Sequence, residues 1–123
     1  MDSVRIYIVE EHDSVRLALA ERLGQAAGLA VIGHSGLAEN VLPDVESSKP
    51  DIVLVEVKRS DGMGFEILRQ LAATLKPPKL IVLTSYPSEW EREAAARAGA
   101  SAYLLKDIAS QELMSVLSEM AAA

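Results

Sequence analysis

The feature that most constrains the fold is a regular alternation between short apolar segments and segments with helical spacing. The apolar segments have the length of buried strands, and the chain between them carries apolar residues three and four positions apart. Strict alternation of this kind predicts a parallel sheet with right-handed crossovers and helices on both faces. The five predicted strands cover residues 4–9, 29–32, 52–57, 80–83 and 102–105.

The sequence marks the helices with signals of different kinds. Ser88 and Glu91 form a capping box that fixes the start of the fourth helix, and Gly99 is placed to end it in a left-handed conformation. In the predicted helix over residues 38–48, Pro43 must lie near the first turn or else break the helix. The other helices are indicated by apolar spacing: Val15, Leu19 and Leu23; Phe65, Leu68, Leu71 and Leu75; and Leu113, Val116, Leu117 and Met120.

Composition narrows the classes of function. With 123 residues the chain has the size of one compact domain, and we expect residues 1–123 to form a single one. The apolar runs fall far short of the ~18 residues that cross a bilayer. Cysteine and a signal-peptide pattern are both absent, which favours a soluble cytoplasmic protein. A formal charge of −6 opposes direct binding to nucleic acid, and nothing indicates a membrane partner.

Chemically distinctive side chains stand at the ends of the predicted strands. Glu10 and Glu11 follow the first strand, Glu56 lies at the end of the third, Thr84 follows the fourth and Lys106 the fifth. Because parallel strands end along one edge of a sheet, where open α/β folds build their sites, we expect these residues to converge. Carboxylates suit Mg²⁺, whereas lysine and threonine can bind phosphoryl oxygens. Solvent exposure of strand ends explains any one of these polar residues, but not all of them together.

The order of these segments resembles the receiver domain of two-component response regulators over essentially the whole chain. Residues 9–16 (VEEHDSVR) stand where the family has its acidic pair and first helix, and residues 50–56 (PDIVLVE) look like the phosphoacceptor strand. Residues 82–85 (VLTS) look like the switch-hydroxyl strand, and residues 98–107 (AGASAYLLKD) like the aromatic-and-lysine strand. The resemblance implies the flavodoxin-like strand order 2-1-3-4-5. It is greatest to receivers that precede a helix-turn-helix DNA-binding domain.

The resemblance also implies roles for the residues around the site. Lys106 and Thr84 correspond to the residues that contact phosphoryl oxygens, and Tyr103 to the aromatic switch that turns inward on activation. Glu56 stands at the phosphoacceptor position, where the family has aspartate. The chemistry implied is that of a signalling module rather than an enzyme.

The acidic residues depart from the family pattern. Glu10 and Glu11 replace the usual aspartates of the acidic pocket, Ser60 stands where a proline is usual, and Met63 where Asp or Asn is usual. Each change from aspartate to glutamate moves a carboxylate outward by about 1.5 Å, one carbon–carbon bond. An octahedral Mg²⁺ shell, with oxygens at about 2.0–2.1 Å, tolerates little of that. We therefore expect metal binding by Glu11 and Glu56 to be weak or lost, and no cofactor.

These departures favour a receiver that works without ordinary aspartyl phosphorylation, in which Glu56 imitates the phosphorylated state weakly and permanently. One alternative is a working phosphoacceptor, with Glu56, Ser60 or Asp61 receiving a phosphoryl group from a histidine kinase. Another is a Mg²⁺-dependent phosphatase with Glu10 and Glu11 as metal ligands. That reading ranks last, because an aspartate nucleophile with a second acid two residues on is missing.

The resemblance places protein contacts, with self-association as the leading form, on the face built from the fourth helix, fifth strand and fifth helix. The expected contact residues are Trp90, Arg97, Tyr103 and Met114, although core packing is the favoured reading of Trp90 taken alone. A histidine kinase and a DNA-binding output domain outside this chain are the other implied partners. Within the site, gathered carboxylates repel, so we expect Lys106 to contact Glu56 directly. If Glu56 turned outward, Lys106 would pair with Glu10 or Glu11 instead.

Overall fold

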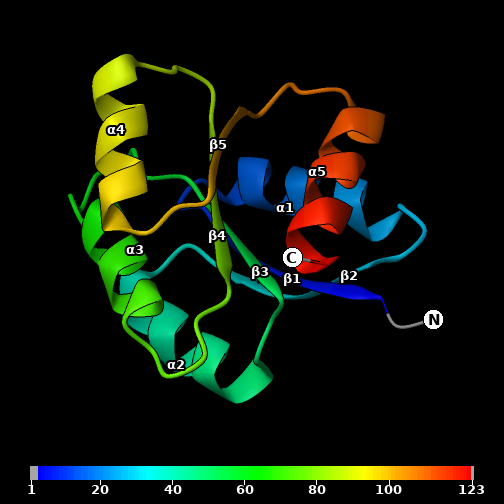
Figure 1. Ribbon diagram of the computed structural model, residues 1–123, viewed down its shortest axis with the longest axis horizontal. Coiled ribbons are helices and arrows are strands. Elements are labelled where there is room, and N and C mark those ends of the chain that lie inside the picture. Colours follow the sequence, from blue (N-terminus) through cyan, green and yellow to red (C-terminus); the bar gives the residue numbers. More distant parts are fainter. Residues whose placement is uncertain (1–2, 123) are drawn as a thin grey trace.

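The fold is one parallel sheet with helices on both faces. The computed structural model describes residues 3–122. The strands are β1 (Val4–Val9), β2 (Leu29–Ser35), β3 (Ile52–Val55), β4 (Lys79–Thr84) and β5 (Ala102–Leu105). The helices are α1 (Asp13–Gly24), α2 (Ala38–Ser48), α3 (Gly64–Ala72), α4 (Glu89–Ala98) and α5 (Ser110–Ala122). The strands are parallel in the order β2-β1-β3-β4-β5, which confirms the predicted flavodoxin-like arrangement (Figure 1).

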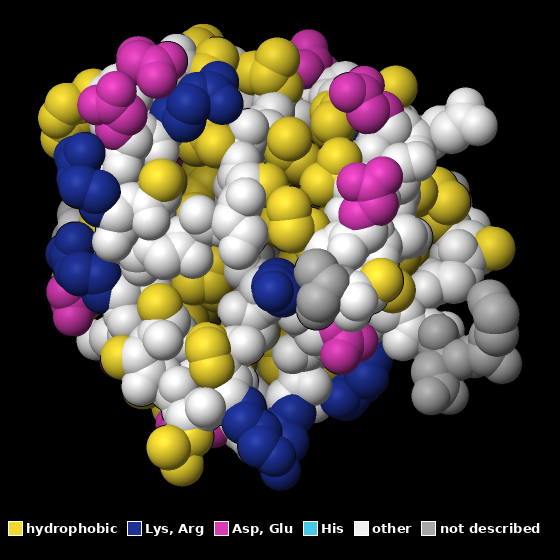
Figure 2. All heavy atoms as spheres, viewed as in Figure 1, with side chains coloured by type: hydrophobic (Ala, Val, Ile, Leu, Met, Phe, Trp, Pro, Cys, Tyr) yellow, Lys and Arg dark blue, Asp and Glu magenta, His cyan; other side chains and the backbone are white. Residues whose placement is uncertain are grey.

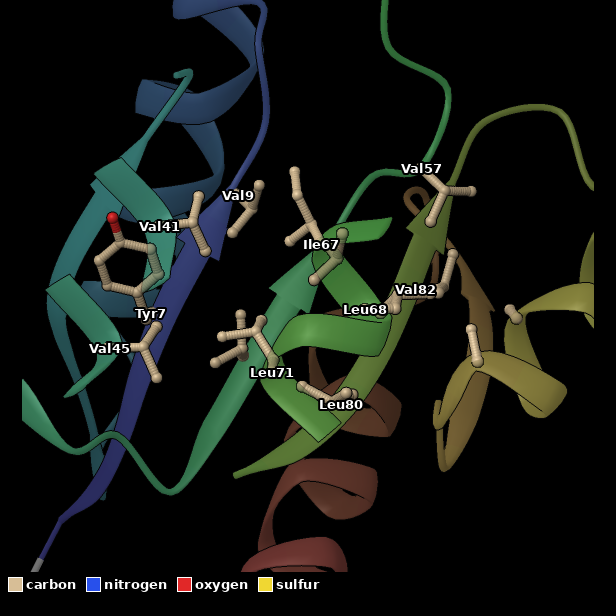
Figure 3. Packing of buried hydrophobic residues seen from close by; sticks show 14 residues of the cluster. Tyr7, Val9, Val41, Val45, Val57, Ile67, Leu68, Leu71, Leu80 and Val82 are labelled. Carbon is tan, nitrogen blue, oxygen red and sulfur yellow. The ribbon is translucent and has the colours of Figure 1, made fainter. Parts of the chain in front are cut away.

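The sheet separates two hydrophobic clusters. Helices α1 and α5 cover one face, and α2, α3 and α4 cover the other (Figure 1). Successive side chains of a strand point to opposite faces, so Ile6 and Ile8 of β1 pack under α1 and α5 while Tyr7 and Val9 pack under α2 and α3. Figure 3 shows the hydrophobic cluster on the side of α2, α3 and α4, with Tyr7 between the sheet and α2. Within residues 3–122, no helix is both long enough and apolar enough to cross a membrane.

The structure corrects several predicted boundaries. Strand β2 extends to Ser35, because its pairing with β1 continues as far as Val9. Strand β3 ends at Val55, earlier than predicted, although the backbone N–H of Glu56 still donates to the carbonyl of Val9 at 3.0 Å. Helix α3 ends at Ala72, so the prediction that Leu75 belongs to its apolar stripe is wrong, and Leu75 is fully exposed.

Helix α2 tolerates a proline in its interior. Pro43 is the sixth residue of the helix, just past its first turn, and the helix continues through it to Ser48. The ring removes one backbone donor and its hydrogen bond. Burial of Val41 and Val45, on either side of the proline, anchors the helix to the sheet and offsets that loss.

The ends of α4 follow the prediction. The side-chain oxygen of Ser88 accepts a hydrogen bond from the N–H of Glu91 at 3.1 Å, and Gly99 ends the helix with φ of 116°. The reciprocal bond of a capping box is replaced, since the N–H of Ser88 donates to the hydroxyl of Tyr103 at 3.1 Å. The carboxylate of Glu91 is thereby left for other partners.

Trp90 lies outside the core. Its side chain is 68% exposed, so the prediction of core packing is wrong. The indole contacts Phe65 of α3 edge to face, with ring centroids 5.9 Å apart and an interplanar angle of 88°. The small residues of α4 that do face the sheet, Ala95 and Ala98, leave no room there for an indole.

Gly64 allows the start of α3 to lie against the chain that leaves β3. A Cβ at this position would lie 2.1 Å from the carbonyl oxygen of Val57. The obstacle is backbone, which cannot rotate away as a side chain can. The loop that follows Glu56 therefore depends on a residue without a side chain.

Replacing Gly64 with alanine should lower the free energy of unfolding by about 1–3 kcal/mol, because the added methyl group displaces backbone. Gly24→Ala is the matched control, since no atom lies within 4 Å of the added Cβ. Urea unfolding followed by circular dichroism measures both. Equal midpoints for the two variants would contradict the close approach at Gly64.

Candidate functional site at the carboxyl edge of the sheet

Lys106 joins the ends of three strands. Glu10 directly follows β1, Glu56 directly follows β3 and Lys106 directly follows β5. The Nζ atom of Lys106 lies 2.5 Å from Oε1 of Glu10 and 2.9 Å from Oε1 of Glu56. The expected contact between Lys106 and Glu56 is thus confirmed, and Lys106 pairs with Glu10 at the same time.

The two carboxylates are buried, and their remaining oxygens also have partners. Glu10 is 1% exposed and Glu56 is 6% exposed. Oε2 of Glu10 accepts from the backbone N–H of His12 at 3.2 Å, and Oε2 of Glu56 accepts from the backbone N–H of Lys58 at 3.1 Å. Complete pairing of this kind makes buried charge tolerable.

The pKa values of Glu10 and Lys106 both favour the charged forms of these residues. Burial alone would raise the pKa of Glu10, but hydrogen bonds from Lys106 and His12 outweigh it and hold that pKa below its ordinary value. Burial would lower the pKa of Lys106, yet the hydrogen bonds to Glu10 and Glu56 raise it above its ordinary value. Lys106 and Glu10 are therefore both ionised at neutral pH.

Glu11 does not join this cluster, and the expectation that it would is wrong. Its two carboxylate oxygens accept from the backbone N–H and the hydroxyl of Ser60, each at 2.7 Å. The hydroxyl bond, followed by the backbone bond, lowers the pKa of Glu11. Ser60 stands on the loop after β3, so Glu11 fixes that loop instead of facing Glu56.

Thr84 belongs to a second polar cluster, formed with Lys58, Glu91 and Tyr103, which the sequence analysis does not predict. Its hydroxyl is fully buried and accepts from Nζ of Lys58 at 2.9 Å. The same ammonium donates to the carbonyl of Tyr86 and to Oε1 of Glu91, each at 2.7 Å. Thr84 stands at the same sheet edge, since its carbonyl accepts from the backbone N–H of Lys106 at 2.9 Å, but its hydroxyl is bonded to Lys58 and not to the acidic residues.

Tyr103 is attached to the second cluster. Its hydroxyl donates to Oε1 of Glu91 at 2.6 Å, and the guanidinium of Arg92 lies 4.9 Å from the centre of its ring. Burial, followed by the bond to Glu91, raises the pKa of the Tyr103 hydroxyl. The ring is half-buried, with its hydroxyl held beneath the first turn of α4.

Three charged residues of this region escaped the sequence reasoning. In the sequence analysis, Glu91 has a role only in the cap of α4, and Lys58 and Arg59 have none. The available signal was the pair of cations within three residues of a buried acid. Arg59 is 1% exposed and donates to the carbonyl of Gly36 at 2.7 Å and to Asp61 at 2.9 Å.

The donor set does not fit a magnesium ion. The oxygens of Glu11 are both occupied by Ser60, and those of Glu56 by Lys106 and Lys58. Over residues 3–122, no group of three or more acidic, histidine or cysteine side chains is placed to hold a metal. An octahedral Mg²⁺ needs several free oxygens around one point, and these carboxylates do not supply them.

Replacing Lys106 with methionine should lower the free energy of unfolding by about 3–5 kcal/mol, because two buried carboxylates then lack a cation. Lys76→Met, at an exposed lysine, is the control and should have almost no effect. Urea unfolding at neutral pH measures both. Adding Glu10→Gln and Glu56→Gln to the Lys106 variant should restore most of the loss. Equal stability of the two lysine variants would contradict the assigned role.

Comparisons with known proteins agree with this fold. The family model described as the response regulator receiver domain matches residues 6–118. The DNA-binding transcriptional activator DevR/DosR of Mycobacterium tuberculosis is 33% identical over 119 residues, which cover 97% of this chain and 55% of the relative. The transcriptional regulatory protein LiaR of Bacillus subtilis is 34% identical over 111 residues, covering 89% and 52%. The chain thus spans about half the length of these relatives.

Solved structures show the same architecture. A two-component response regulator of the LuxR family from Aurantimonas sp. SI85-9A1 matches with a TM-score of 0.88 and 23% identity, covering 98% of this chain and 86% of that one. The BeF3-activated receiver domain of Klebsiella pneumoniae RstA matches with a TM-score of 0.85 and 24% identity, covering 97% and 99%. Since the family model matches nearly all of the chain, this chain belongs to the receiver domains of two-component response regulators.

Proposed function

We propose that this receiver transmits its signal by protein contact and without aspartyl phosphorylation. The observation that carries the proposal is the position of Lys106 between Glu10 and Glu56, at 2.5 Å and 2.9 Å. Glu56 stands at the phosphoacceptor position, and Lys106 at the position that would contact a phosphoryl oxygen. The ammonium is already bound by carboxylates, so a phosphoryl group would have to displace them.

Glu56 also supplies part of what a phosphoryl group would supply. Its extra methylene carries a negative charge toward the end of β5, where it meets Lys106. One carboxylate charge is weaker than the charge of nearly two that a phosphate carries at neutral pH. The native chain therefore resembles a receiver held partly toward its activated state, with a switch residue, Tyr103, already attached to α4.

The rival chemistries receive no support from the site. Phosphoryl transfer depends on a positioned nucleophile, an in-line approach and stabilisation of developing charge, usually by a metal. The Glu56 carboxylate is buried and fully paired, and Glu11 is bound to Ser60. A working acceptor or a magnesium-dependent phosphatase would require both side chains to reorganise.

The proposed contact surface is the face formed by α4, β5 and α5, with self-association as the leading form. Figure 2 shows this face, with apolar side chains near its centre and charged side chains of both signs toward its edges. Trp90 and Arg97 are exposed on α4, with the indole of Trp90 lying against Phe65 of α3, whereas Tyr103 and Met114 are half-buried. A second copy would gain most from the exposed indole.

The remaining partners follow from the relatives. DevR/DosR is named as a DNA-binding activator and is about twice the length of this chain. We propose that this receiver acts with an output domain outside residues 1–123, as a single non-enzymatic domain in the cytoplasm. A histidine kinase remains a proposed partner, while direct nucleic-acid contact is opposed by the charge of −6.

Incubating the native chain with acetyl phosphate and Mg²⁺ should leave its intact mass unchanged, because the Glu56 carboxylate is committed to Lys106. The triple variant Glu10→Asp, Glu11→Asp, Glu56→Asp shortens the acids and should gain one phosphoryl group. Glu56→Asp alone should gain less. A mass gain in the native chain that Glu56→Gln or Ser60→Ala abolishes would contradict the proposal and identify the acceptor.

Light scattering at high protein concentration should show a dimer in equilibrium with the monomer. Trp90→Ala should shift that equilibrium toward the monomer, because it removes the largest exposed apolar side chain of α4. Leu75→Ala is the control, as Leu75 is exposed outside that face. A native chain that stays monomeric throughout would rule out self-association as the leading contact.

A further inference from the structure

The cluster around Glu91 connects the loop after β3 with α4 and β5. Glu91 lies in the first turn of α4 and is only 5% exposed. Its Oε1 atom accepts from Nζ of Lys58 at 2.7 Å and from the hydroxyl of Tyr103 at 2.6 Å. A single carboxylate oxygen therefore holds two residues that come from opposite sides of β4.

Lys58 is held through both its side chain and its backbone. Its ammonium contacts Glu91, while its backbone N–H donates to Oε2 of Glu56 at 3.1 Å. The other oxygen of Glu56 is held by Lys106. A continuous series of bonds thus runs from Lys106 through Glu56, Lys58 and Glu91 to Tyr103.

Breaking the ion pair between Lys58 and Glu91 would cost free energy mainly at Glu91. Lys58 is 39% exposed, so its ammonium would be hydrated if released. Glu91 is buried, and within residues 3–122 the cation paired with it is Lys58. The amino end of α4 also favours a negative charge at Glu91, but this contribution is small beside that of a paired cation. Loss of Lys58 should therefore displace Glu91 and with it the hydroxyl of Tyr103.

We propose that Lys58 is a positioning residue that couples the charge at Glu56 to the side chain of Tyr103. A change at Glu56 moves the backbone of Lys58, which moves the ammonium that holds Glu91, and Glu91 in turn holds Tyr103. The coupling rests on the proposed function only in taking Glu56 as the point where a signal enters. Spatial continuity alone does not establish coupling, so the test must measure the coupling itself.

The test is a double-mutant cycle read by ¹⁹F NMR. The chain is labelled with 3-fluorotyrosine, and its three tyrosine resonances are assigned by single Tyr→Phe variants. Glu56→Gln is then introduced into the native chain and into the Lys58→Met variant. We expect Glu56→Gln to shift the Tyr103 resonance in the native chain, and the shift to be lost in Lys58→Met.

Tyr7 is the internal control, because its hydroxyl donates to Asp44 at 2.6 Å on the α2 side of the molecule. Its resonance should stay unchanged throughout the cycle. If Lys58→Met does not fold, the double variant Lys58→Met, Glu91→Gln replaces it. In that variant the buried carboxylate that Lys58 pairs with has been removed.

Two results would overturn the proposal. One is an unchanged Tyr103 resonance when Glu56→Gln is made in the native chain. The other is a shift of equal size in the native and Lys58→Met backgrounds, which would mean that the effect travels by another route. The phosphodonor experiment measures the intact mass of the chain, whereas this cycle measures the ¹⁹F resonance of Tyr103. Failure of the coupling is therefore distinguishable from failure of the proposed function.

Discussion

The site depends on one ammonium group between two buried carboxylates. Glu10 and Glu56 directly follow the neighbouring strands β1 and β3, and two buried carboxylates gathered at one point repel each other. Lys106 offsets that repulsion by lying within 2.9 Å of both. Because the three residues follow β1, β3 and β5, this pairing also fixes the edge of the sheet against which the loops pack.

The carboxylate of Glu56 reaches Lys106. We propose that its extra methylene at the same time withdraws it from the arrangement that a metal and an incoming phosphoryl group require. The fold remains that of a receiver, since the sheet, its order and its helices are set by the apolar pattern. A change of chemistry can therefore occur at the site while the surrounding structure is retained.

Most of the fold was predictable because its signals are local. Buried strands and amphipathic helices differ in period, and the cap at Ser88 and the left-handed Gly99 are written in adjacent residues. The contact of Lys106 with Glu56 was predictable for a different reason, namely that gathered carboxylates need a counter-charge. The first argument needs only residues close in the sequence, and the second needs only the order of the strands.

The directions of the loop side chains could not be predicted in the same way. A strand end fixes where a residue stands, but its partner depends on competitors from other segments. Ser60 bonds to the carboxylate of Glu11, and Lys58 bonds to the hydroxyl of Thr84, so these two side chains do not join the cluster around the Lys106 ammonium. Trp90 was mispredicted for a related reason, because the small residues of α4 occupy the space beside the sheet.

A crystal structure of the native chain grown with Mg²⁺ and beryllium fluoride tests the central claim most directly. The predicted result is that Nζ of Lys106 stays within about 4 Å of Glu56, as an ion pair requires, with no beryllium fluoride bound to the Glu56 carboxylate. An octahedral ion held by Glu11 and Glu56 at about 2.1 Å, with Lys106 turned to a fluoride, would contradict it.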